Sequence, residues 1–189
     1  MAELTGISSP LRYLDELDVG DQWQSRGRTI TEADLLTFGT WSGDMHPLHT
    51  DEEYARKTQF GTRIFHGPGA LAIAFGLEMS LGWKLGSAIA FLGLKDWNLR
   101  APVFIGDTLH VCEQVTDIRP STSKTDRGVV TTRVQLINQA GTVCQDGLWT
   151  VLMYRQAPPV LPSEVGESHG HRHTDNPTPT VMVKPDLVP

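Results

Sequence analysis

The chain has 189 residues, of which 39% are hydrophobic and 20% are charged, and its formal net charge at pH 7 is −6. This length suffices for one domain with its own hydrophobic core and leaves room for a tail. The acidic balance argues against a nucleic-acid or anionic-membrane partner, which would require a basic face, although a few local arginines and lysines can still hold a small anionic ligand.

The ends of the chain differ in composition from its body. Residues 158–189 contain seven of the twelve prolines and three of the seven histidines, and they contain no aromatic residue. We therefore divide the chain into an N-terminal extension over 1–12, one domain over 13–156 and a tail over 157–189 that we expect to be disordered. The first residues show no signal segment, so we expect a cytoplasmic protein in which both cysteines are reduced.

The first half of the domain is predicted to form helices and loops. Thr31 is a suitable N-cap for a helix with acidic residues in its first turn, and Gly43 is a suitable left-handed end for that helix. Asp51 begins a second, short helix. Pro68 begins a long helix over 68–82, which is so apolar that we expect it to be buried almost all round. The apolar stretch is interrupted by polar residues and is too short to cross a bilayer.

The second half of the domain is predicted to form an antiparallel sheet. Four segments rich in β-branched and aromatic residues are separated by turn residues, at 87–97, 108–118, 128–138 and 142–154. The short break between the last two segments predicts a hairpin. We therefore expect an α+β fold in which the antiparallel β-sheet wraps around the long central helix. The long strands at the end of the domain would leave an edge that dimerisation could cover.

The segment between the predicted helices, 42–54, contains the strongest candidates for chemistry. It places Asp44 five residues before His49, around a proline that interrupts regular helix and bends the chain. A carboxylate and a neutral imidazole held on the same side can position and activate a water molecule. The alternative is that Asp44 caps a turn and His49 fills a half-buried position.

The start of the long helix, His66-Gly67-Pro68-Gly69, is a second candidate. A buried helix N-terminus offers free N–H groups and the positive end of the helix dipole. The amides of Gly67, Gly69 and Ala70 could hold a carbonyl oxygen as it becomes enolate-like. The alternative is that these glycines only permit close packing. Arg100, after the first predicted strand, could meet an anionic ligand.

Three blocks of residues occur together in this sequence. They are Ser42-Gly43-Asp44 with Pro47-Leu48-His49, Asp51 and Tyr54-Ala55; His66-Gly67 before an apolar helix; and Arg100-Ala101-Pro102-Val103 with Gly106-Asp107-Thr108. In this order and at this spacing they resemble the MaoC-like family of R-specific enoyl-CoA hydratases and dehydratases. The resemblance covers about residues 15–155 and implies a single hot-dog domain.

The resemblance also implies a reaction. In the family, an aspartate and a histidine hold a water molecule, and the matching positions here are Asp44 and His49. The water adds to a trans-2-enoyl thioester to give a 3R-hydroxyacyl thioester, or leaves in the reverse reaction. Backbone amides at the helix start, here Gly67 with Gly69, would hold the thioester oxygen.

The remaining expectations from the resemblance concern the surroundings of this site. His46, Pro47 and His66 would line it. The substrate would be a thioester of coenzyme A, or of an acyl carrier protein, with no metal and no redox cofactor. The family members are homodimers or larger assemblies with the acyl tunnel near the dimer interface.

Three positions depart from the family pattern. His46 stands where the family usually has Asn, Ala72 stands near the place where several members carry Ser, and Pro68 removes one N–H donor from the helix start. These departures leave the substrate and the direction of the reaction open. Two alternatives also remain: a hot-dog thioesterase, which would hydrolyse the same kind of ligand, and a non-catalytic acyl-binding subunit of a two-chain dehydratase.

Overall fold

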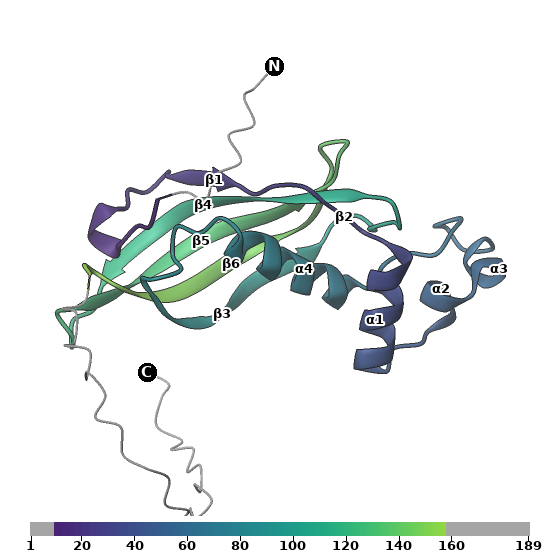
Figure 1. Cartoon of the computed structure of the whole chain (residues 1–189), viewed down its shortest axis with the longest axis horizontal. Helices are drawn as coiled ribbons and strands as arrows, with labels where there is room; N and C mark the ends of the chain where they lie inside the picture. The colour runs from purple at the N-terminus through teal and green to yellow at the C-terminus, as the bar shows by residue number, and fades with distance from the viewer. Residues whose placement is uncertain (1–9, 158–189) are drawn as a thin grey trace, which may run out of the picture. The chain divides into compact units, whose positions relative to one another are not determined.

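The computed structural model describes residues 10–157, so the predicted tail from residue 158 onward and the first nine residues lie outside the described residues. Long antiparallel strands form one sheet, and helix α4 lies along it (Figure 1). The predicted α+β architecture is confirmed. The elements in chain order are η1 (Leu14–Glu16), β1 (Gln22–Gln24), β2 (Arg28–Thr29), α1 (Glu32–Ser42), α2 (Pro47–Thr50), α3 (Glu52–Ala55), α4 (Gly67–Met79), β3 (Ala88–Leu99), β4 (Thr108–Pro120), β5 (Arg127–Ile137) and β6 (Val143–Tyr154).

All four predicted strands are present, and β5 and β6 form the predicted hairpin. The order in the sheet is β1-β4-β5-β6-β3, with the short β2 also paired to β4. The expectation that the last strands leave the open edge was wrong, because β6 lies between β5 and β3. The edge strand is β3, which pairs with β6 on one side only. The two short strands β1 and β2, which the sequence analysis did not predict, lie at the other edge.

The core lies between the sheet and α4. Buried side chains alternate along β4 and β5, as a half-buried sheet requires. These side chains meet Ala70, Ala74 and Leu77 of α4. The expectation that this helix is buried almost all round was wrong, because Ala72 and Met79 are exposed in the single chain. The sheet covers only one side of the helix, and the inward-facing positions follow the helical repeat.

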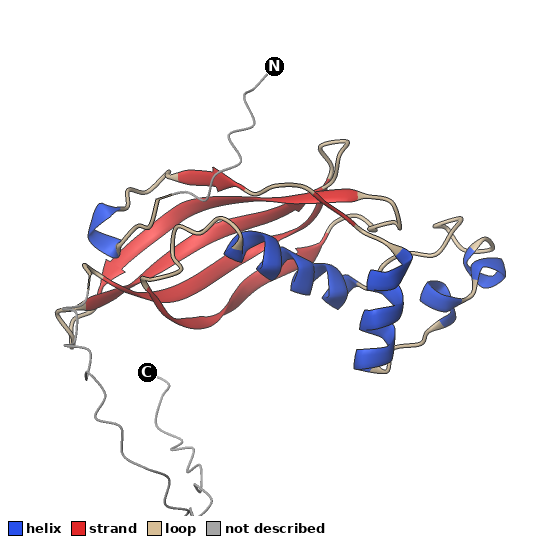
Figure 2. Ribbon diagram, in the orientation of Figure 1, coloured by secondary structure: helices blue, strands red, loops and turns tan. Residues whose placement is uncertain are grey.

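Helices α1, α2 and α3 lie beyond one end of the sheet (Figure 2). The predicted N-cap of α1 is confirmed, since the Asp34 N–H donates to Thr31 Oγ1 at 3.4 Å, and Gly43 ends the helix in the left-handed region with φ of 78°. The predicted start of α3 at Asp51 is also confirmed. Helix α2 was not predicted. Proline interrupts a helix only in its interior, and Pro47 occupies the first turn, where its missing N–H costs nothing.

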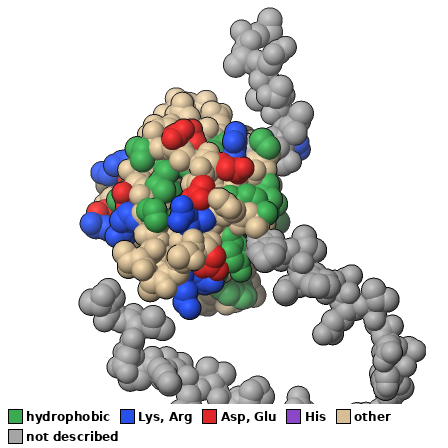
Figure 3. Space-filling model, turned by 90° about the vertical axis from the view of Figure 1, so that its left-hand side faces the viewer, with side chains coloured by type: hydrophobic (Ala, Val, Ile, Leu, Met, Phe, Trp, Pro, Cys, Tyr) green, Lys and Arg blue, Asp and Glu red, His purple; other side chains and the backbone are tan. Residues whose placement is uncertain are grey.

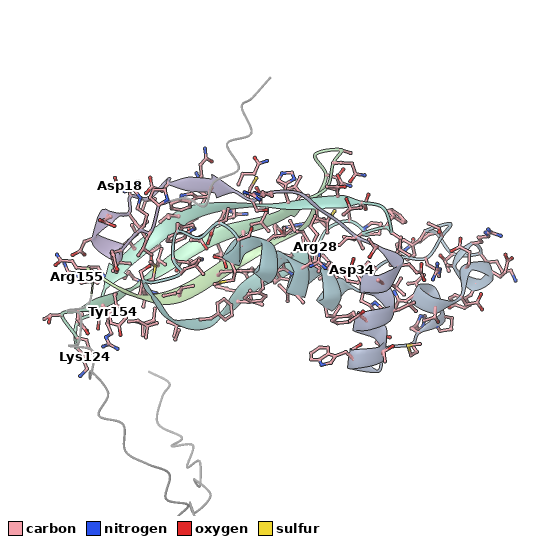
Figure 4. The ribbon with its side chains drawn as sticks, in the orientation of Figure 1. Asp18, Arg28, Asp34, Lys124, Tyr154 and Arg155 are labelled. Atoms are coloured by element: carbon pink, nitrogen blue, oxygen red, sulfur yellow. The ribbon has the colours of Figure 1, made fainter. Side chains whose placement is uncertain are left out.

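Ion pairs and backbone hydrogen bonds fasten these helices to the rest of the domain. Arg28 on β2 pairs with Asp34 on α1 (Figure 4). Arg63, in the loop before α4, donates to both carboxylate oxygens of Glu32 on α1 at 2.7 and 2.8 Å and pairs with Glu52 on α3 at 3.2 Å. The two-fold contact of one guanidinium with one carboxylate fixes direction as well as distance. The helices are therefore held in a defined position at the start of α4.

At the end of the domain remote from α1, acidic and basic side chains are interspersed with hydrophobic and neutral ones (Figure 3). Among residues 10–157, no helix is long and apolar enough to cross a membrane. Cys112 and Cys144 are both free thiols, and burial raises the pKa of each.

Three ionisable side chains meet in the core near the C-terminal end of α4. Lys84 Nζ contacts Glu78 of α4 and donates to Glu113 Oε1 of β4 at 2.8 Å. Glu113 also accepts hydrogen bonds from Trp83 Nε1 at 3.1 Å and from Thr132 Oγ1 at 2.8 Å. Two carboxylates thus share one ammonium group in a buried position, where an uncompensated charge is costly.

Glu78 is the side chain of this group whose protonation removes the excess negative charge. Burial raises its pKa to about 7; Glu113 adds to the shift and Lys84 opposes it. The pKa of Lys84 is raised as well, because the two carboxylates outweigh the effect of burial. Glu78 is therefore partly protonated at neutral pH, while Lys84 stays charged.

This arrangement predicts that the folded state loses stability as the pH rises. An unfolded chain releases the Glu78 proton near pH 4.5 and the folded chain near pH 7, so the free energy of unfolding should fall between these values and level off above them. Urea denaturation at a series of pH values would measure this, and Glu78→Gln should flatten that part of the profile. Glu53→Gln, at a side chain that is 74% exposed, serves as the control. An unchanged slope in Glu78→Gln would contradict the prediction.

Candidate active site

Asp44 lies in the short connection between α1 and α2. Gly43 turns the chain out of α1, and the Asp44 N–H donates to Ser42 Oγ at 3.2 Å. One carboxylate oxygen of Asp44 accepts a hydrogen bond from the His46 N–H at 3.3 Å. The carboxylate is 48% exposed, so it is accessible to a ligand while its direction is fixed by the backbone on both sides.

His49 is the third residue of α2 and lies half-buried beside Asp44. Its Nδ1 contacts the Ile64 carbonyl oxygen at 2.7 Å. Because a carbonyl can only accept, Nδ1 carries the proton, and Nε2 of the neutral ring has a free lone pair. This Nε2 lies 4.0 Å from Asp44 Oδ2. The structure thus brings the two predicted catalytic side chains together, on separate short elements.

The surroundings of His49 favour its neutral form. Burial lowers its pKa below the ordinary value of 6.5, and the neighbouring rings of His66 and His46 lower it further. The Ile64 carbonyl and the Asp44 carboxylate act in the opposite direction without reversing the shift. A ring of this kind can accept a proton at neutral pH, which is the property that general base chemistry needs.

His66 connects this pair to the core. Its ring is fully buried and stacks on the His49 ring with a centroid distance of 3.8 Å. Its Nε2 lies 2.9 Å from the Asp44 carbonyl oxygen and therefore donates to it, which leaves Nδ1 as a buried acceptor without a partner among the described residues. His66 is the residue immediately before α4, so the helix start and the predicted catalytic pair are joined by one side chain.

Two contributions to the site were missed by the sequence analysis. The first is the Ile64 carbonyl. No sequence pattern can identify it, because every residue has a backbone carbonyl. The second is Gly39 on α1, which packs against the site: a Cβ there would lie 3.3 Å from Met45 Sδ, a tight contact, and 3.5 Å from His66 Cε1, an ordinary one. A glycine inside a helical pattern was the available signal, since it costs stability unless close packing requires it.

The structure separates the two glycines predicted to hold an oxyanion. Gly67 lines a cavity of about 260 Å³, together with Phe60, Ile64, Phe65, Ala70, Leu99, Arg100, Ala101, Pro102, Val103 and Gln145. Gly69 is buried instead, and a Cβ there would lie 2.7 Å from Phe65 Cζ and 3.1 Å from Phe38 Cγ. Only Gly67 of this pair borders the cavity.

The other predicted site residues have different positions. His46 and Pro47 are exposed at the start of α2, and Nδ1 of His46 accepts a hydrogen bond from the Leu48 N–H at 3.1 Å. Arg100 lines the cavity, but its guanidinium donates to Asp146 Oδ1 at 2.8 Å. A ligand would have to share this guanidinium with Asp146.

One group of side chains among residues 10–157 could approach a metal ion. Ligand atoms of Asp44, His49 and His66 lie within 4.8 Å of one another. Histidine binds metals through a lone pair in the plane of its ring, and the two rings here are stacked at 29°. Their lone pairs therefore run side by side instead of converging, and Nε2 of His66 is already a donor. The arrangement suits proton transfer better than metal coordination.

A family model for the MaoC like domain matches residues 18–139. The chain belongs to the MaoC-like domain family. The match includes the segment with Asp44 and His49, the start of α4 and the first three long strands. It therefore contains all three blocks noted in the sequence.

Relatives in this family include hydratases and dehydratases. The chain is 34% identical over 143 residues to an (R)-specific enoyl-CoA hydratase of Rhodospirillum rubrum, covering 76% of this chain and 92% of the relative. It is 35% identical over 108 residues to a 3-hydroxybutyryl-CoA dehydratase of Methylorubrum extorquens, covering 57% of this chain and 66% of the relative. It spans only 29% of the Protein MaoC of Klebsiella aerogenes, at 35% identity over 100 residues and 53% of this chain.

Solved structures agree with this assignment. A MaoC-like dehydratase from Rhodospirillum rubrum superposes with a TM-score of 0.68 at 32% identity, covering 77% of this chain and 98% of that one. A protein of Mycobacterium tuberculosis described as having a double hotdog fold superposes with a TM-score of 0.67 at 19% identity, covering 84% of this chain and 48% of that one. This MaoC-like domain therefore has the hot-dog fold.

The hydrogen bonds of His49 make a prediction that needs no substrate. In ¹⁵N NMR, the neutral ring should carry its proton on Nδ1, and its titration midpoint should lie below 6.5. Asp44→Asn should move the midpoint further down, because the carboxylate charge raises the pKa of His49. His110 is the control, since burial alone lowers its pKa and Asp44 does not act on it. A proton on Nε2, or a midpoint that rises in Asp44→Asn, would contradict this description.

Proposed function

We propose that this MaoC-like protein is a hydro-lyase acting on acyl thioesters, which adds water to a trans-2-enoyl-CoA to give a (3R)-3-hydroxyacyl-CoA or removes it in the reverse direction. The proposal is carried by the separation of 4.0 Å between Asp44 Oδ2 and the free lone pair of His49 Nε2. An (R)-specific enoyl-CoA hydratase and a 3-hydroxybutyryl-CoA dehydratase among the relatives support it.

The separation of the two atoms suits a bridging water molecule. An oxygen about 2.8 Å from both Oδ2 and Nε2 makes a good hydrogen bond with each of them. In hydration, the water oxygen bonds to C3 of the enoyl group and one water proton passes to the Asp44–His49 pair. C2 receives a proton from the same pair, which returns to its starting state. In this proposal Asp44 is the general base, and His49 orients the water and shares the proton transfers.

Negative charge builds up on the thioester oxygen while C3 is attacked. The Gly67 N–H, in the first turn of α4, is the group we propose to stabilise it; Gly69, the second predicted donor, does not line the cavity. The N–H groups of a first helical turn have no acceptor inside the helix, and the helix dipole adds positive potential there. The Ala70 N–H is already used, since it donates to the His66 carbonyl oxygen at 2.9 Å.

The cavity beside Gly67 is the place we propose for the acyl group. Its lining is mainly apolar, which suits a hydrocarbon chain, and Leu99 lies directly over Gly67. Coenzyme A is the proposed carrier of the acyl group, with an acyl carrier protein as the alternative. Hydration needs proton transfers only, so the proposal includes no metal and no redox cofactor.

The first test is the loss of enoyl-thioester absorbance when the purified protein is mixed with crotonyl-CoA. Asp44→Asn and His49→Gln should each lower kcat/KM by about a hundredfold or more, because each removes a proton-transfer partner. Their circular dichroism and melting temperatures should stay close to those of the parent. Glu53→Gln, at an exposed position on α3, is the matched control. Full activity in Asp44→Asn would contradict the proposal.

The two alternative functions give different outcomes in the same experiment. A thioesterase would release free coenzyme A thiol, which a thiol reagent detects, without the hydrated product. A non-catalytic subunit would be inactive alone and would gain activity only after mixing with a second chain. The exposed carboxylate and the free Nε2 lone pair favour hydration over both alternatives.

We further propose that the protein is a homodimer joined at β3. This strand pairs on one side only and exposes four large apolar side chains, Phe91, Leu92, Leu94 and Leu99, by 44%, 54%, 39% and 63%. An unpaired apolar edge invites another strand, and a second copy of the same edge can pair with it antiparallel about a twofold axis. The partner would then cover the side of α4 that the sheet leaves open.

Leu94→Lys should shift the sedimentation velocity from that of two chains to that of one chain, because a buried ammonium group would be unpaired at the interface. Val19→Lys is the control, since Val19 is 64% exposed and lies just before β1, at the other edge of the sheet. A parent protein that sediments as a single chain at micromolar concentration would contradict the proposed dimer.

A further inference from the structure

His46 lies between the two predicted catalytic residues and bonds to the backbone or side chain of both. Its N–H donates to Asp44 Oδ1 at 3.3 Å, and its carbonyl oxygen accepts from the His49 N–H at 2.9 Å. Its ring nitrogen Nδ1 accepts from the Leu48 N–H at 3.1 Å. One residue therefore holds the carboxylate on one side and the helix that carries His49 on the other.

The ring of His46 acts as the N-cap of α2. Its backbone is not helical, with φ of −56° and ψ of 138°, and its side chain satisfies an N–H of the first turn. Most helices use a hydroxyl, carboxylate or amide oxygen for this purpose. Helix α2 has only four residues, so it has little stability of its own, and loss of its cap would free the residue that positions His49.

A nitrogen cap differs from an oxygen cap in its response to pH. Nδ1 accepts a hydrogen bond only when it is unprotonated, so the cap exists with the proton on Nε2. Uptake of a second proton turns Nδ1 into a donor, which then faces the Leu48 N–H. Histidine is the side chain type that changes charge between pH 5 and 8, whereas an asparagine cap would not change.

Several groups face the His46 ring. The ring of His49 on α2 has its centroid 6.3 Å away, and that of Tyr54 on α3 has its centroid 6.0 Å away. Asp44 lies on the other side of the residue, bonded to its N–H, and His66 stacks behind His49. Protonation of His46 would therefore place a positive charge near the His49 ring, whose own protonation is already disfavoured by burial.

We propose that His46 is a positioning residue whose neutral ring caps α2 and holds His49 toward Asp44, and that protonation of this ring removes the cap and switches the site off. This inference rests on the proposed function. The proton comes from solvent, and no other reactant is needed.

Two variants separate the cap from its titration. His46→Ala removes the cap, and kcat with crotonyl-CoA should fall about fivefold at pH 8, the effect of losing a typical N-cap, while KM changes less. His46→Asn offers an oxygen in place of Nδ1, and it should recover most of the rate that the Ala variant loses. A rate in His46→Asn as low as in His46→Ala would overturn the capping role.

The pH profile tests the switch. On acidification from pH 8, log kcat/KM of the parent should approach a slope of two, because His46 and His49 both take up a proton. The slope for His46→Asn should approach one. Glu53→Gln, which leaves the cap intact, should follow the parent. Equal slopes in the parent and in His46→Asn would overturn the switch.

An NMR titration makes this inference independent of activity. The Leu48 amide proton should shift with pH together with the His46 ring protons in the parent, and should not follow such a transition in His46→Asn. A Leu48 signal that ignores the His46 titration would overturn the inference even in an active enzyme. Inactivity of the parent toward every enoyl thioester would contradict the proposed function, while the Leu48 signal would still decide whether the cap exists.

Discussion

The site depends on a single buried imidazole at the start of α4. His66 donates from Nε2 to the Asp44 carbonyl oxygen at 2.9 Å and stacks on His49, so it fixes the backbone of one predicted catalytic residue and the ring of the other. It also contacts Phe38 of α1, with a centroid distance of 5.0 Å. Since His66 is continuous with the first turn of α4, any movement of the three outer helices relative to the core would break these contacts together. The Asp44 carbonyl accepts a hydrogen bond from the His66 ring, and the Ile64 carbonyl accepts one from the His49 ring. Each carbonyl determines the tautomer of the ring that it contacts.

The two ends of helix α4 lie in different electrostatic surroundings. At its N-terminus, the first-turn N–H groups and the positive end of the helix dipole lie next to an apolar cavity. Near its C-terminus, Glu78 and Glu113 share Lys84, and burial leaves Glu78 with a raised pKa. A buried ionic group contributes little net stability, so the hydrophobic contacts of α4 with the sheet must supply most of what holds the helix. The packing of α4 against the sheet therefore makes the helix a fixed support for the site.

Local patterns predicted most elements, and the errors have physical reasons. Thr31, Gly43 and Asp51 act as predicted because capping and left-handed turns depend on neighbouring residues only. Pro47 was taken as an obstacle to helix, although it occupies the first turn of one, where the rule does not apply. The edge strand was misplaced because the order of strands depends on contacts between distant parts of the chain, which periodicity does not contain. The exposure of Ala72 and Met79 was missed for a related reason: an all-apolar helix has no polar face to indicate which side remains open.

By itself, the sequence determined the strands, the principal helices, the pairing of Asp44 with His49 as candidates and the resemblance to the MaoC-like family, since these follow from residue types at short spacings. Only the tertiary structure decided which atoms lie close enough to act together. It selected the Ile64 carbonyl as the partner that leaves His49 Nε2 free, and it placed Gly67 at the cavity while burying Gly69 against Phe65. The reason is that tautomers and helix-end donors are set by groups that approach from elsewhere in the chain. The local sequence does not indicate which backbone carbonyl or which packed side chain will approach a site residue. These contacts form only when the fold brings the groups together.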